Sequence, residues 1–204
     1  MEIILESVSK RFTLSQWVLR DLNYTFISGK KYGLSGVNGS GKSTLVSLLA
    51  GLSRPTKGEV YHRNNQINID AILWHKHLTL ATPYSDLLGY LSLNEILKFY
   101  FTFKKLKNSL SQDEFLQITK FYEHQDKFIK NFSSGMKQRL KLGLALLAES
   151  EVIILDEPCT NLDEDAQRWY YNTLEDYTTN SLVIIASNDA QDFKKLDEII
   201  QLGK

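Results

Sequence analysis

The stretch GVNGSGKST, residues 36–44, constrains this chain more than any other. It contains the pattern G-x-x-x-x-G-K-[ST], a loop between a strand and a helix that cradles phosphates. Its glycines let backbone N–H groups turn toward one anion, and the following helix adds its positive dipole end. A plain strand-to-helix turn is the alternative, but the Lys-Ser pair favours phosphate. The predicted phosphate-binding residues are Gly36, Val37, Asn38, Gly39, Ser40, Gly41, Lys42, Ser43 and Thr44, with Lys42 on the β- and γ-phosphates and Ser43 on Mg²⁺.

A second signal is VIILDEP, residues 152–158. Its near-continuous apolar run is typical of a buried parallel strand, and the strand ends in two carboxylates. One acid at this position suits Mg²⁺ binding in a P-loop ATPase, and we assign that role to Asp156. We expect Glu157 to point to the opposite side, where it would polarise water for attack on the γ-phosphate. An acidic turn that caps the strand is the alternative when the segment is taken alone.

Strand and helix patterns alternate in the first and last thirds of the chain, and a helical block separates them. Strands are expected at residues 2–8, 17–27, 30–36, 78–82, 152–158, 182–186 and 198–202. Helices are expected at residues 42–51, 96–106, 115–124 and 136–148, and after the helix cap Asp163. Capping boxes at Ser92–Glu95 and Ser111–Glu114 precede two of these helices. The predicted fold class is α/β: a single P-loop NTPase domain with a core of residues 1–83 and 151–204 and an inserted helical subdomain over 84–150.

Composition excludes several classes of protein. The 204 residues include 24 Lys and Arg and 24 Asp and Glu, so no excess of positive charge points to nucleic acid. Cys159 is the only cysteine, which rules out an internal disulfide. Residues 1–12 are too charged for a signal peptide, and no apolar run approaches the ~20 residues that span a bilayer. If the chain serves a membrane, we expect it to act through another chain.

Four segments occur in the order found in ATP-binding cassette (ABC) ATPases: GVNGSGKST, NFSSGMKQRLKLGLALL, VIILDEP and TNLD. Over essentially its whole length the chain resembles the nucleotide-binding subunit of an ABC transporter. FSSGMKQ is similar to the family signature Leu-Ser-Gly-Gly-Gln, which Ser133 and Gly135 match and Phe132, Ser134 and Met136 do not. The resemblance implies that two cassettes sandwich two ATP molecules head to tail, with Ser133 and Gly135 on the other subunit's ATP. Ser133 can serve as a helix N-cap as well.

The resemblance also assigns weaker positions. Phe12 falls where the family stacks an aromatic ring on adenine, and a core phenylalanine is the alternative. Leu162 and Asp163 resemble a loop that crosses the dimer interface. The family places a Gln after the strand at 78–82, where this chain has Pro83 and Tyr84, and Ser85 or Asp86 are the possible substitutes.

The triplet Ser187-Asn188-Asp189 stands where the family has Thr-His-Asp, whose His contacts the γ-phosphate. Ser187 and Asp189 are expected to cap the following helix. Asn188 keeps a hydrogen-bonding amide but has no titratable proton. We therefore expect the catalytic residues to be Glu157, Lys42 and Asn188, with slow but real hydrolysis.

These observations predict an ATP-hydrolysing subunit that powers a membrane transporter through nucleotide-dependent dimerisation. The expected cofactors are ATP and Mg²⁺. The expected partners are a second, identical or homologous cassette and an integral-membrane permease that docks beside residues 84–90 on the cytoplasmic face. The aromatic stripe Phe99, Tyr100, Phe101 and Phe103 is expected to be core, with some of it facing that partner. The alternatives are a soluble ABC protein acting on ribosomes or DNA and a poorly hydrolysing, regulatory half of a heterodimer. A small-molecule kinase is disfavoured by the signature segment.

Overall fold

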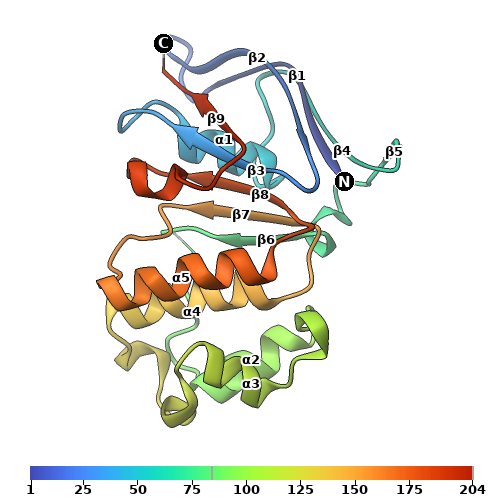
Figure 1. Cartoon of the computed structure of the whole chain (residues 1–204). Helices are drawn as coiled ribbons and strands as arrows, with labels where there is room; N and C mark the ends of the chain where they lie inside the picture. Colours follow the sequence, from blue (N-terminus) through green and yellow to red (C-terminus); the bar gives the residue numbers. More distant parts are fainter. Residues whose placement is uncertain (84, 204) are drawn as a thin grey trace. The chain divides into compact units, whose positions relative to one another are not determined.

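The computed structural model describes residues 1–83 and 85–203 and divides into two compact units. The core unit comprises residues 1–80, 150–157 and 180–203, and the helical unit comprises the described residues of 81–149 together with 158–179. Each unit has a hydrophobic cluster of its own, so each can be understood from its own packing. Figure 1 shows both units coloured along the chain.

A five-stranded sheet organises the core unit (Figure 1). Its order is β6 (Leu78–Ala81), β7 (Val152–Asp156), β8 (Leu182–Ala186), β3 (Lys31–Ser35) and β9 (Glu198–Gln201). The pairs β7–β8, β8–β3 and β3–β9 are parallel. All five residues of β7 and of β8 are buried, which explains the apolar sequence of β8 and of β7 up to Asp156. Because Asp156 pairs with Ala186, and Ala186 with Leu34, the loops after β7, β8 and β3 leave from the same edge of the sheet.

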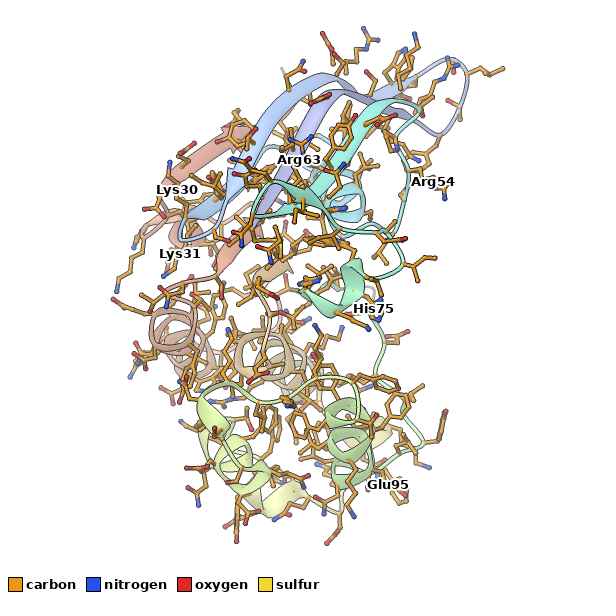
Figure 2. All side chains as sticks on the ribbon, turned by 90° about the vertical axis from the view of Figure 1, so that its right-hand side faces the viewer. Lys30, Lys31, Arg54, Arg63, His75 and Glu95 are labelled. Atoms are coloured by element: carbon orange, nitrogen blue, oxygen red, sulfur yellow. The ribbon has the colours of Figure 1, made fainter. Side chains whose placement is uncertain are left out.

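The core unit also contains an antiparallel sheet and the helix α1 (Lys42–Leu49). The antiparallel order is β2 (Trp17–Ile27), β1 (Glu2–Arg11), β4 (Lys57–Asn64) and β5 (Ile67–Asn68), and short 3₁₀ turns occur at η1 (Trp74–Lys76) and η5 (Ala190–Phe193). Two features terminate α1. Gly51 adopts a left-handed φ of 73° after the helix, and Trp74 Nε1 donates to the Leu49 carbonyl at 3.2 Å. Arg63 on β4, labelled in Figure 2, donates to Asn68 across the β4–β5 hairpin.

The helical unit contains four α-helices and three 3₁₀ turns among its described residues. These are α2 (Leu93–Phe101), η2 (Lys107–Ser109), α3 (Gln112–Ile118), η3 (Tyr122–His124), η4 (Ile129–Asn131), α4 (Ser134–Leu147) and α5 (Glu164–Tyr177). Their apolar faces meet in a core that includes Leu97, Phe115 and Leu140. The predicted α/β class is confirmed. Within the described part of the chain, no helix combines the length and the apolar character needed to cross a bilayer.

Local capping signals determine where three helices begin. Both capping boxes form: Ser92 and Ser111 accept backbone N–H groups of Glu95 and Glu114, whose carboxylates accept the serine N–H groups in return. Glu95 is labelled in Figure 2. Asp163 caps α5 by accepting the N–H of Ala166 at 2.8 Å, as predicted.

Several predicted boundaries differ from the structure, and three of them change where an element ends. The first strand does not stop at residue 8, because Lys10 and Arg11 still pair with β2, so β1 includes the start of the expected turn. The helix expected over 115–124 ends at Ile118, because Lys120 adopts a left-handed φ of 58°. The helix expected over 96–106 likewise ends early, at Phe101.

Replacing the first cap should weaken the helical unit measurably. Ser92→Ala removes the acceptor for the Glu95 N–H and should lower the free energy of unfolding by about 1 kcal/mol. Ser92→Thr retains the hydroxyl and should recover most of that loss. Urea unfolding followed by circular dichroism measures both variants. Equal stability of Ser92→Ala and the wild type would show that this capping box contributes nothing.

Candidate functional site

The loop between β3 and α1 depends on glycine at defined positions. Gly39 and Gly41 adopt φ 83° and φ 101°, in the left-handed region that glycine tolerates. A Cβ on Gly41 would lie 2.8 Å from Leu19 Cδ2, so a side chain there would clash with β2. Gly41 is also the N-cap of α1, so the loop delivers the chain directly into the helix N-terminus. This is the strand–loop–helix context that the phosphate-binding pattern requires.

Lys42 lies at the centre of the site. It is 6 % exposed, and its ammonium donates to the Gly36 carbonyl at 2.8 Å and to Asn188 Oδ1 at 2.6 Å. Glu157 Oε1 lies 4.0 Å from the same nitrogen. The structure therefore brings together residues from the phosphate loop, the acidic strand end and the loop after β8.

Asp156 is a buried carboxylate at the end of β7, with 2 % exposure. Burial raises its pKa above the ordinary value, and a hydrogen bond from the Ser43 side chain and the charge of Lys42 oppose that rise. Its Oδ1 atom is buried and has no hydrogen-bond partner among the described residues. Ser43, the other residue expected to ligate Mg²⁺, is therefore hydrogen-bonded to Asp156.

Glu157 follows in a strained backbone conformation. Its φ is 49°, a left-handed value that is uncommon outside glycine, and its N–H donates to the Ala186 carbonyl at 2.8 Å. Burial raises the pKa of its carboxyl, while a hydrogen bond from the Asn188 backbone and the charge of Lys42 lower it. Strained residues of this kind persist where the surrounding structure holds them, often at functional sites.

The triplet after β8 proves to be both a cap and part of the site. Asp189 accepts the Gln191 N–H at 2.8 Å and caps the 3₁₀ turn η5. Ser187 donates to the buried Asp192 carboxylate at 2.6 Å, which ties the two ends of this turn together. Asn188 lies between them and directs its side chain to Lys42, while its Nδ2 donates to Asn38 Oδ1 at 2.5 Å. The contact between Asn188 and Asn38 could not be predicted from sequence, because 150 residues separate the partners.

The helical unit holds the second predicted anion site. Ser133 is the N-cap of α4 and accepts the Met136 N–H at 3.1 Å. Gly135 is packed closely, because a Cβ there would lie 2.8 Å from the Asn161 carbonyl. A cavity of about 210 Å³ opens beside both residues and is also lined by Arg139 and Asp163. The guanidinium of Arg139 lies over the Trp169 ring, 4.7 Å from its centroid.

The remaining predicted positions differ in exposure and in their contacts. Phe12 is 70 % exposed at the end of the β1–β2 hairpin, 5.2 Å from the Lys10 ammonium, so the core alternative is wrong. Tyr84 lies outside the described residues. The carbonyl of Pro83 accepts from Lys141 at 3.3 Å, and the Ser85 hydroxyl donates to the Thr82 carbonyl at 2.8 Å. The aromatic stripe divides: Phe99 and Phe103 are exposed, whereas Tyr100 and Phe101 pack against the core of the helical unit.

The buried charge of Asp156 should make stability depend on pH. An acid whose pKa is raised on folding keeps its proton in the folded chain where the unfolded chain has lost it. Its contribution to stability therefore falls as pH rises from the ordinary Asp value, about 3.9, through the raised folded pKa. Asp156→Asn should consequently be more stable than the wild type at pH 7 and lose that advantage near pH 4.

Chemical unfolding at the two pH values measures this difference, with the exposed Asp126→Asn as the matched control. The assigned effect of burial would be contradicted if Asp156→Asn were no more stable than the wild type at pH 7. It would also be contradicted if the gain in stability were equal at both pH values.

Comparison with known proteins agrees with this geometry. The family model described as "ABC transporter" matches residues 19–160. Human phospholipid-transporting ATPase ABCA3 is 32 % identical over 173 residues, which is 83 % of this chain but 10 % of that protein, so the chain spans about a tenth of this relative. A solved ATP-binding subunit of an ABC transporter superposes with a TM-score of 0.84 at 22 % identity, covering 99 % of this chain and 86 % of that one.

A dimeric ATP-binding cassette with bound ADP and Pi gives a TM-score of 0.82 at 22 % identity and covers 98 % of this chain and 94 % of that one. The two structural matches show the fold, and the family model extends over more than half of the chain. The predicted family and fold class are confirmed. The chain belongs to the ABC transporter family and has the fold of an ATP-binding cassette.

Proposed function

We propose that this cassette hydrolyses Mg-ATP and powers a membrane transporter by pairing with a second cassette when nucleotide is bound. The observation that carries the proposal is the convergence of Lys42, Glu157 and Asn188 at one edge of the parallel sheet. Most catalysis of phosphoryl transfer consists of positioning and charge stabilisation, and these residues supply both.

The phosphate loop would bind the nucleotide. Its backbone N–H groups and the α1 N-terminus attract the phosphates, and Lys42 would exchange its present acceptors for phosphate oxygens. Asp156 Oδ1, buried and without a partner among the described residues, fits a divalent cation, as does the neighbouring Ser43 hydroxyl. Mg²⁺ commonly takes one or two protein ligands and completes its shell with water and phosphate oxygens. Bound there, the ion would neutralise charge on the β- and γ-phosphates.

Glu157 would act as the general base. A base is most effective when its pKa lies nearer the operating pH, and burial moves the pKa of Glu157 in that direction. The backbone N–H of Asn188 and the charge of Lys42 hold the carboxylate in place. We assign to Asn188 the contact with the γ-phosphate that a His makes elsewhere in the family.

A second cassette would complete the site. Ser133 and Gly135 at the start of α4 would bind the partner's ATP, and Phe12 would stack on adenine within its own site. The 70 % exposure of Phe12 and the cavity beside Ser133 leave both accessible to ligand. The loop at Leu162 and Asp163 would cross the interface.

The remaining partner would be an integral-membrane permease on the cytoplasmic side of a membrane, with no nucleic acid involved. Exposed aromatic side chains in the helical unit, at Tyr90, Phe99 and Phe103, support such a docking surface. Pro83 and Asn188 favour a second candidate, the poorly hydrolysing half of a heterodimer. A homologous partner cassette could then provide the missing Gln and His.

Glu157→Gln should reduce turnover at least about 100-fold while ATP still binds, because the amide cannot accept the proton of the attacking water. Phosphate release from Mg-ATP measures turnover, and Glu149→Gln, an exposed change in the helical unit, is the control. Equal turnover in Glu157→Gln and the wild type would remove Glu157 as the base.

ATP should convert Glu157→Gln protein from monomer to dimer. Adding Ser133→Asp should prevent the dimer, because Asp preserves the N-cap of α4 but repels the partner's phosphates. Light scattering after size-exclusion chromatography with Mg-ATP distinguishes the two states. A dimer that forms equally well with Ser133→Asp would exclude the signature segment from the interface, and failure of Glu157→Gln to dimerise would favour a heterodimer.

A further inference from the structure

Asn188 is held by three different partners in the core unit. Its backbone N–H donates to the Glu157 carboxylate. Its Oδ1 accepts from Lys42 at 2.6 Å, and its Nδ2 donates to Asn38 Oδ1 at 2.5 Å. One residue therefore connects the proposed base, the phosphate-loop lysine and a second position in the same loop.

The chemistry of these partners determines which way the amide faces. An ammonium group can only donate, so the Asn188 side chain must turn its oxygen toward Lys42. Its NH₂ group then faces Asn38, which must offer its own oxygen. A rotation of either amide by 180° would place two donors or two acceptors against each other.

The backbone of Asn188 has separate supports. The buried Ser187–Asp192 hydrogen bond and the Asp189 cap fix the turn on either side of it. Those contacts do not reach the terminal amide. If Lys42 turns to bind a phosphate, the Asn188 amide loses its hydrogen bond to Lys42. Of the two side-chain contacts described above, the one with Asn38 would then remain to orient the amide.

We propose that Asn38 is a positioning residue that holds the Asn188 amide in its working orientation, so that its loss lowers turnover through Asn188 and leaves nucleotide affinity nearly unchanged. The inference rests on the proposed role of Asn188 in hydrolysis. It differs from the general phosphate-loop role of Asn38, which would act on nucleotide affinity.

The test is a double-mutant cycle on the full chain with Asn38→Ala, Asn188→Ala and the pair combined, measuring kcat and KM for Mg-ATP separately. Asn38→Ala should lower kcat about fivefold, the effect of one ordinary hydrogen bond, with KM changed by less than about twofold. The double variant should be no slower than Asn188→Ala alone, because both changes remove the same interaction.

Two further variants complete the design. Asn38→Gln retains an amide oxygen on an exposed side chain and should restore most of kcat. Asn180→Ala, an exposed change at the opposite end of β8, should behave as the wild type.

A rise in KM with unchanged kcat in Asn38→Ala would assign Asn38 to phosphate binding and overturn the inference. Losses that multiply independently in the double variant would overturn it as well. A wild-type chain without turnover would defeat the proposed hydrolysis itself, and the inference with it. An active wild type with independent losses would defeat the inference alone.

Discussion

The candidate site depends on one buried positive charge. Lys42 is almost wholly removed from water, and an ammonium group in that position is costly unless acceptors surround it. The Gly36 carbonyl and Asn188 Oδ1 supply those acceptors, and Glu157 supplies an opposite charge at 4.0 Å. These partners come from three loops at one edge of the parallel sheet. Satisfying this charge therefore fixes the relative positions of the groups that chemistry on a phosphate requires.

The acids of the same edge are arranged for chemistry at the expense of stability. Burial raises the pKa of both Asp156 and Glu157, so their charged forms are disfavoured in the folded chain. The left-handed backbone of Glu157 adds strain. A fold selected only for stability would avoid these features, and their concentration beside Lys42 is typical of an active site.

In the helical unit, the N-terminus of α4 opens onto a cavity. Glycine at position 135 allows the Asn161 carbonyl to approach α4 closely. Gln138 of α4 donates to the Pro158 carbonyl at 2.9 Å, so the loop that follows the acidic strand is anchored to α4. The Arg139 guanidinium rests on Trp169 of α5. Of these residues, Gly135, Arg139 and Asn161 also line the cavity beside Ser133.

Features that depend on neighbouring residues could be predicted from the sequence. The phosphate loop, both capping boxes, the Asp163 cap and the buried character of β7 and β8 all follow from patterns within a few residues. The early end of α3 at Ile118 could not be predicted, because an ordinary lysine adopts the left-handed conformation there. Nor could the exposure of Phe12, since an aromatic residue suits either a core or a ligand surface. The contact of Asn188 with Asn38 and Lys42 was decided by the tertiary structure alone, because only the parallel order of β7, β8 and β3 brings their following loops to one edge.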